Sequence, residues 1–226
     1  MAYKRTSTVA VATENVTLAA RLVGLGFGVA GEGRADADIE RTLVEVSRVG
    51  MLEDDLRLLS LLTTWLGVHH ARVHADRLIR FVSVEPEDRV RAYWAAVGGW
   101  LVADRRLHRL AGLAPVERVD LLRVGTAFQL QRRGEDLRFA GSAMRVPAGT
   151  LRERAGDVLT PSELLQRHAG YRNRVLLGSN FRAEVWTTLE REPTLPVAEV
   201  ARRAACSFAA AWEAARDFRL LHGTPP

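Results

Sequence analysis

The chain is poor in several residue types, and each shortage excludes a class of protein. Cys206 is the single cysteine among 226 residues, so the sequence predicts neither an internal disulfide nor a zinc site built from several cysteines. A reducing compartment fits this usage. No segment approaches the roughly 18 uninterrupted apolar residues of a membrane-spanning helix, and no basic stretch followed by an apolar one opens the chain as in a secretory signal. We therefore expect a soluble, cytoplasmic protein without membrane contact.

Lysine and isoleucine are also scarce, which changes how the positive charge is interpreted. Lys4 is the only lysine, so arginine supplies nearly all of the 32 basic residues behind the net charge of +5. This bias is what a GC-rich genome produces whatever the function. Arginines and acidic residues are mixed along the sequence, with no basic tail or block. A surface that binds nucleic acid would therefore have to be assembled by folding.

Helical periodicity dominates the first half of the chain. A strand or arm at Thr8–Ala12 and a short helix from Asn15 to Val23 are expected first. Apolar residues then recur at i, i+3 and i+4 spacing in four segments: Asp36–Val49, Leu52–Leu66, Val68–Val82 and Pro86–Leu110. Large aromatic side chains dominate buried area, so five of them are expected in the core: Trp65, Phe81, Tyr93, Trp94 and Trp100. The sequence predicts a helical bundle domain over residues 1–113.

The pattern changes between residues 114 and 150. Phe128, Leu130, Leu137 and Phe139 alternate with polar residues on either side of the polar stretch 133–136. Such alternation around a turn is typical of a β-hairpin. We predict a β-hairpin segment over residues 114–150, so that the fold class is mainly α with a small β-hairpin.

Residues 151–226 are predicted to form a C-terminal domain, joined to the rest through residues 150–160. Thr160, Pro161 and Glu163 match the capping box that opens a helix, and this helix is expected to stop at Gly170. Three further helices are expected at Phe181–Glu192, Pro196–Ala204 and Phe208–Leu221. Pro193 ends the first of them, and Ser207 suits the N-cap of the last.

The last two of these helices meet at small residues. Ala204 and Ala205 precede the turn at Cys206, and Ala211 and Ala214 lie on the inner face of the final helix. Small side chains let two helices cross closely at about 90–120°. This stretch resembles the helix-turn-helix of bacterial transcription regulators, including ArsR-like and MarR-like winged proteins and several antitoxins. The resemblance implies that a dimer binds double-stranded DNA through the final helix.

The stretch departs from that pattern in two places. Ala205 stands where such motifs commonly carry glycine, so a positive φ at this position would be strained. The sequence given ends soon after the final helix, and we therefore expect no β-wing.

The predicted DNA-contact residues follow from the resemblance. They come from the last two helices and the turn between them: Arg202, Arg203, Ser207, Phe208, Ala209, Trp212, Arg216 and Arg219. The arginines suit phosphates, with Arg172, Arg174 and Arg182 nearby, whereas the start of the final helix is apolar and offers bases few hydrogen bonds. We expect a weakly sequence-specific transcriptional regulator or antitoxin-like protein. The alternative is an adaptor that binds a protein through its helical N-terminal part or through Phe208 and Trp212, since exposed aromatics anchor interfaces.

Three further patterns indicate other functions, each more weakly. Residues 26–31 spell G-x-G-x-x-G, but a helical pattern precedes them where a dinucleotide-binding fold needs a strand. His70 and His74 are one helical turn apart, as in a pair of zinc ligands, without a third ligand. Arg216 and His222 match the arginine–histidine pattern of HEPN-type ribonucleases, which remains a third hypothesis. We expect a protein that is not an enzyme and has no cofactor or metal.

Overall fold

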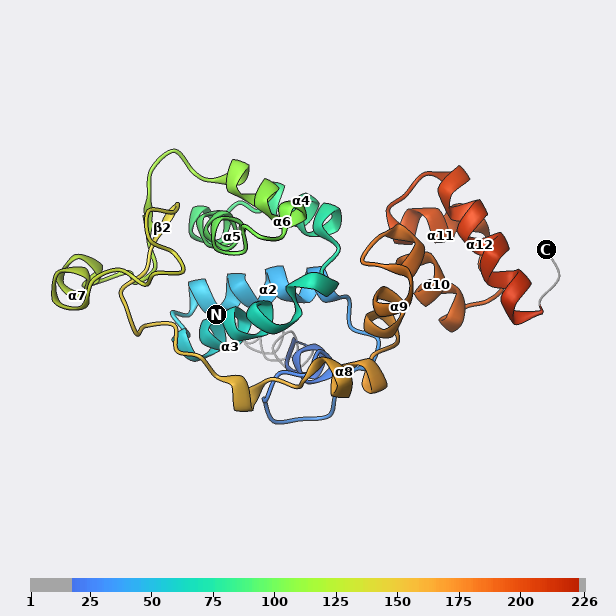
Figure 1. Cartoon of the computed structure of the whole chain (residues 1–226), viewed down its shortest axis with the longest axis horizontal. Coiled ribbons are helices and arrows are strands. Elements are labelled where there is room, and N and C mark those ends of the chain that lie inside the picture. The colour runs from blue at the N-terminus through green and yellow to red at the C-terminus, as the bar shows by residue number, and fades with distance from the viewer. Residues whose placement is uncertain (1–17, 224–226) are drawn as a thin grey trace, which may run out of the picture.

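The computed structural model describes residues 18–223 and has a mainly helical fold with one very small sheet (Figure 1). This confirms the predicted fold class as far as it is mainly helical with a small β part. The predicted strand at Thr8–Ala12 and the start of the helix from Asn15 lie outside the described residues. Within residues 18–223, no helix is both long and apolar enough to cross a membrane.

Buried apolar side chains form two separate cores. The larger core lies within residues 18–177, which we call the bundle, and the smaller one within the last three helices, which we call the three-helix unit. After a helical stretch at residues 18–24, the first part of the bundle contains α2 (Ile39–Leu52), α3 (Leu56–His69), η1 (His70–Arg72), α4 (Ala75–Ser83), α5 (Asp88–Trp100), α6 (Arg105–His108) and η2 (Arg109–Leu113). Figure 1 shows the three-helix unit at one end of the molecule.

Side-chain caps explain where the first helices begin. The carboxylate of Asp38 accepts a hydrogen bond from the backbone N–H of Arg41 at 3.1 Å, and that of Asp55 accepts one from Leu58 at 2.9 Å. Each bond satisfies an N–H that lacks a partner within the first turn of its helix. Both helices start within a few residues of their predicted positions.

Two helices expected to be continuous are broken. The segment predicted from Val68 to Val82 is divided by η1, with α4 beginning only at Ala75. The segment predicted from Pro86 to Leu110 ends as α5 at Trp100, after which the chain folds back and packs η2 on α5. A Cβ on Gly98 would lie 2.9 Å from the carbonyl oxygen of Leu107, so this close approach requires glycine.

The predicted aromatic core is confirmed at Trp65, Tyr93 and Trp94, which are fully buried. Their polar atoms are paired: Trp65 Nε1 donates to the carbonyl of Leu25 at 2.8 Å, and Trp94 Nε1 donates to Ser47 Oγ at 3.0 Å. Phe81 and Trp100 pack against the edge of this core and are half-buried.

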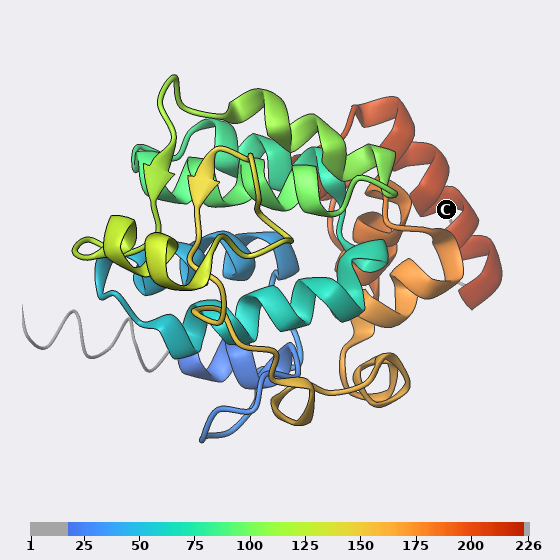
Figure 2. The same ribbon diagram turned by 60° about the vertical axis from the view of Figure 1, so that its left-hand side comes forward.

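The predicted β-hairpin is wrong. The sheet pairs β1 (Val119–Asp120) with β2 (Met144–Arg145) in parallel, and α7 (Thr126–Arg133) occupies the place of the first predicted strand (Figure 2). In so short a stretch, apolar residues two apart fit a partly exposed helix as well as a strand. Phe128 is 61% exposed and Leu137 is 92% exposed, whereas Phe139 is fully buried. The alternation therefore did not mark one buried face.

The last five helices include one that was not predicted. They are α8 (Pro161–Arg167), α9 (Ala169–Leu177), α10 (Phe181–Arg191), α11 (Val197–Ala204) and α12 (Phe208–His222). The capping box that opens α8 is confirmed, with Thr160 Oγ1 accepting from Glu163 N and Glu163 Oε2 accepting from Thr160 N. Leu164 and Tyr171 pack in the larger core although they follow residue 151. The smaller core contains only residues of α10–α12 and the chain between them.

Candidate nucleic-acid interface

The helices α10, α11 and α12 pack around a small core of their own. Val185, Leu189 and Val200 are fully buried in it, and Phe218 is nearly so. Where α12 crosses the other two helices, Ala204, Ala211, Ala214 and Ala215 are buried. The predicted small residues at the crossing are thus confirmed, and they allow the close contact between helices that a helix-turn-helix needs.

The turn between α11 and α12 has the strained residue that the sequence predicted. Ala205 adopts a left-handed conformation with φ of 55°, and among residues 18–223 only one other non-glycine residue, Asp54, has a positive φ. The N–H of Cys206 donates to the carbonyl of Ala201 at 3.1 Å, which closes the end of α11. Ser207 Oγ then accepts from Ala210 N at 3.2 Å, so the predicted N-cap of α12 is confirmed.

One face of the first two turns of α12 is exposed, on the outside of the molecule (Figure 1). Phe208 is 58% exposed and Trp212 is 48% exposed, and the smaller Ser207 and Ala209 are exposed beside them. The Arg216 guanidinium lies 5.6 Å from the centre of the Trp212 ring. These predicted residues therefore share one free face of α12.

Arg202 and Arg203 lie apart from that face. Both bind Glu199, with Arg202 Nη2 at 2.6 Å and Arg203 Nε at 2.7 Å from Glu199 Oε1, and Arg203 also reaches Glu192 at 2.6 Å. Hydrogen bonds from the two arginines lower the pKa of the Glu199 carboxyl to about 2. Both arginines line a cleft between the three-helix unit and the bundle, which no residue of α12 lines.

Arg174 cannot contact DNA, contrary to the prediction, because it is buried between the bundle and the three-helix unit. Its Nη1 lies 2.6 Å from Glu40 Oε1 and its Nη2 lies 2.5 Å from Glu184 Oε1. The other two arginines named with it are at the surface, where Arg172 lies 3.6 Å from Glu190 and Arg182 lies 3.5 Å from Asp217.

A second arginine, Arg77 of α4, completes this buried ion network. It pairs with Asp38 and lies 3.4 Å from Glu40 Oε2, and its Nη1 donates to the carbonyl of Arg203 at 3.1 Å. Burial by itself would raise the pKa of the Glu184 carboxyl, but the charges of Arg174 and Arg77 outweigh burial, and this pKa lies below its ordinary value. The network therefore holds α10 and α11 against α2, α4 and α9.

His168 is buried at the same junction. Its Nδ1 accepts from Tyr171 N at 3.0 Å, which caps α9, and its Nε2 donates to the carbonyl of Ala37 at 2.9 Å. His69, in the core of the bundle, is likewise bonded through both ring nitrogens, to Tyr171 and to the carbonyl of Leu159. Burial lowers the pKa of each imidazole to about 4, so both rings are neutral at pH 7.

The weaker patterns of the sequence are not assembled into sites. His70 lies in η1 and His74 precedes α4, and no group of three or more His, Cys, Asp or Glu suited to a metal ion occurs within residues 18–223. His222 stacks on Phe218 with ring centroids 4.1 Å apart, whereas Arg216 contacts Trp212 and Asp217.

Comparisons of the chain with protein-family models, with curated proteins and with solved structures found no match.

Proposed function

We propose that the chain is a cytoplasmic DNA-binding protein of the helix-turn-helix type, a transcriptional regulator or antitoxin-like protein, in which α12 contacts duplex DNA. The observation that supports this is the exposed start of α12, which follows a tight turn and a side-chain cap on a compact three-helix unit. A recognition helix presents its N-terminal residues to the major groove from such a unit.

The residues at the start of α12 define what the helix can read. Phe208 and Ala209 offer apolar contacts to thymine methyl groups, and the Ser207 hydroxyl is a single polar group beside them. The N–H groups of the first turn that remain free suit a phosphate. With few donors aimed at base edges, this face supports weak sequence preference, with most of the affinity coming from phosphates.

Phosphate contacts would come from Arg216 and Arg219, which lie further along α12. Two neutralised phosphates in each chain correspond to a slope of about −2 for the logarithm of affinity against the logarithm of salt concentration. Replacing Arg219 with glutamine should reduce this slope by about 1 for every duplex sequence. The bundle would serve dimerisation, which places two copies of α12 on half-sites about 34 Å apart.

The test is fluorescence anisotropy with labelled duplex DNA at low salt. Ala209→Glu places a carboxylate on the exposed first turn of α12, where it suits the helix N-terminus and so preserves folding, and it should weaken binding by more than about tenfold. Val124→Glu adds the same charge to the bundle, at a residue that is 87% exposed, and should leave binding within about twofold. Absence of duplex binding at low salt, or equal affinities for the two variants, would overturn the proposal.

A second candidate function is docking of a protein on the same face. Phe208 and Trp212 favour it, because they are large exposed side chains and because tryptophan and arginine are frequent anchors of interfaces. In this case the parent chain does not bind duplex DNA, and Trp212→Ala abolishes capture of the protein partner. The two candidates therefore give opposite results in the anisotropy experiment.

A further inference from the structure

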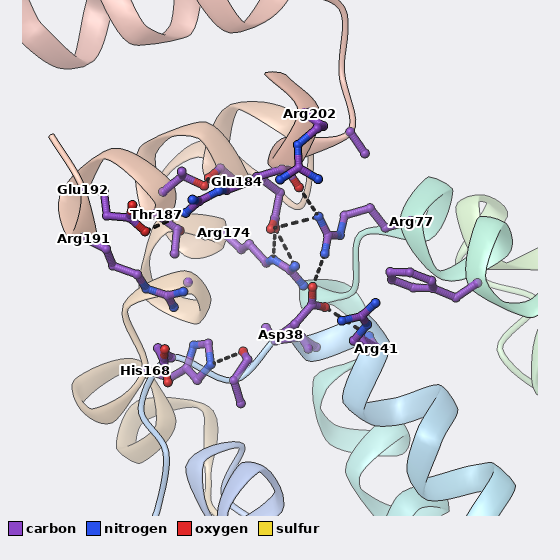
Figure 3. Close-up of a pocket in the computed structure, with 18 of the residues that line it drawn as sticks. Asp38, Arg41, Arg77, His168, Arg174, Glu184, Thr187, Arg191, Glu192 and Arg202 are labelled. Atoms are coloured by element: carbon purple, nitrogen blue, oxygen red, sulfur yellow. Dashed lines mark hydrogen bonds and ion pairs between the residues drawn. The ribbon is translucent and has the colours of Figure 1, made fainter. Parts of the chain in front are cut away.

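A cleft of about 460 Å³ lies between the bundle and the three-helix unit (Figure 3). We call it the junction cleft. It is lined from α2, α4, α10 and α11 and from the chain around His168. Its volume is in the range of sites that hold small molecules, about 300–1,000 Å³.

The lining of the junction cleft is rich in charge, with seven arginines and four acidic residues. Four of the arginines have carboxylate partners. Arg77 and Arg174 belong to the buried network with Glu184, and Arg202 and Arg203 share Glu199. Their charges are satisfied within the protein, so they leave little positive potential for a ligand.

Three arginines of the cleft remain: Arg41 of α2, Arg80 of α4 and Arg191 of α10. Among residues 18–223, no carboxylate lies within ion-pair distance of any of them; Arg80 reaches only the carbonyl of Ala205, at 3.5 Å. Asp36 lines the same cleft and pairs with Arg34 at 2.7 Å. The hydrogen bond from Arg34 lowers the pKa of the Asp36 carboxyl most, and the charge of Arg191 also lowers it, from beyond ion-pair distance. Figure 3 shows Arg41 and Arg191 on opposite sides of the cleft, so the unpaired charge comes from both the bundle and the three-helix unit.

Arginine stays protonated, and its planar fork of donors matches the oxygens of a phosphate group. Three such groups placed around one cleft repel one another unless an anion lies between them. Apolar surface is also present, since the half-buried Phe81 contributes to the lining. An aromatic ring beside phosphate-binding arginines suits the flat base of a nucleotide.

We propose that the junction cleft binds a small ligand with two or more phosphate groups, held by Arg41, Arg80 and Arg191 and bridging the bundle and the three-helix unit. The ligand class is a nucleoside polyphosphate or an inorganic polyphosphate, which share this chemistry. The proposal does not rest on DNA binding by α12, because no residue of α12 lines the cleft.

The test is isothermal titration calorimetry of the full chain with pyrophosphate, with ATP and with adenosine at low ionic strength. Pyrophosphate and ATP should bind and adenosine should not, and tighter binding of ATP than of pyrophosphate would identify the nucleoside polyphosphate as the ligand. Equal binding of the two would identify the phosphates alone as the recognised group. Binding of adenosine with the same affinity as ATP would overturn the proposal.

The matched variants are Arg41→Gln with Arg191→Gln together, and Arg132→Gln as the control. Arg41 and Arg191 are exposed and unpaired, so their replacement removes no internal ion pair. Arg132 is an exposed arginine on α7, which lies at the end of the molecule opposite to the three-helix unit (Figure 1), and it has no carboxylate partner within residues 18–223. The double variant should bind ATP at least tenfold more weakly and the control within about twofold.

Two results would contradict the proposal. One is the absence of heat from both pyrophosphate and ATP with a chain whose circular dichroism is that of a folded helical protein. The other is a loss of duplex DNA affinity in the double variant without any binding of ATP to the parent chain, which would assign these arginines to DNA phosphates.

Discussion

The bundle and the three-helix unit differ in the side chains that form their hydrophobic cores. The core of the bundle contains Trp65, Tyr93 and Trp94, whose polar atoms all have partners. The core of the three-helix unit is built largely from alanine and valine, with Phe218 as its largest nearly buried side chain. A small core supplies little hydrophobic free energy, so the unit depends more on its contacts with the bundle than the bundle depends on the unit.

The largest effect is expected from breaking the ion network that joins the two regions. Arg174→Gln leaves Glu40 and Glu184 buried without their main cation, and the free energy of unfolding should fall by about 3–5 kcal/mol. Urea unfolding followed by circular dichroism measures the change. The control is Arg172→Gln, at an exposed arginine 3.6 Å from its partner, which should change the value by less than about 0.5 kcal/mol. A loss below about 1 kcal/mol for Arg174→Gln would mean that the junction contributes little to stability.

A smaller effect is expected from pH, through His69 and His168. Both imidazoles have a folded-state pKa of about 4, below the ordinary value, so the unfolded chain binds their protons first as the pH falls. Stability should therefore be complete above about pH 6.5 and should decline between about pH 6.5 and pH 4. The lowered pKa of Glu184 has the same sign at still lower pH.

The variant His168→Asn sharpens this prediction. Asparagine can still cap α9 through its side-chain oxygen, but it does not titrate. The loss in the free energy of unfolding between pH 6.5 and pH 4 should therefore be smaller in this variant by about 1–3 kcal/mol. Thermal unfolding at a series of pH values measures it. An unchanged slope would show that the ring of His168 does not govern the acid sensitivity of the junction.

The smallest effect is expected within the three-helix unit alone. Ala205→Gly relieves the left-handed conformation at φ of 55° and should stabilise the unit by about 0.5–1 kcal/mol. The same change at Ala209, which has helical geometry on α12, should destabilise it by about 1 kcal/mol. Hydrogen exchange of α11 and α12 resolves the two, with α3 and α5 as the internal reference. A decrease in protection for Ala205→Gly would contradict the strain at the turn.

The part of the fold that could be predicted from sequence is the part governed by neighbours in the chain. Helices α10 to α12 begin and end within two residues of their predicted bounds, because prolines and caps such as Ser207 act locally. The sequence does not predict helix α9, because Gly170 is a residue type that commonly ends a helix. A Cβ at Gly170 would lie 3.2 Å from His168 Cε1, so the glycine is needed for close packing against His168 and does not end a helix.

The candidate surfaces were predictable to different degrees. The exposed start of α12 follows from helical periodicity. Glu199 lies three and four residues before Arg202 and Arg203, a spacing at which a carboxylate and an arginine pair on a helix, so their pairing is also a local feature of the sequence. The buried network joins Glu40 to Arg174 across 134 residues, and the junction cleft combines segments equally distant. No local pattern in the sequence predicts contacts between residues so far apart in the chain.

The turn before α12 is held from outside as well as from within. The carbonyl of Arg203, at the end of α11, accepts a hydrogen bond from Arg77 of α4 at 3.1 Å, and the carbonyl of Ala205, in the turn, accepts one from Arg80 of α4 at 3.5 Å. α4 therefore restrains the turn of the helix-turn-helix from outside the three-helix unit. The orientation of α12 depends on the packing of the bundle as well as on the three-helix unit. A ligand that brings α4 and α10 closer together would therefore also change the orientation of the exposed face of α12, because α4 is hydrogen-bonded to the turn that precedes α12.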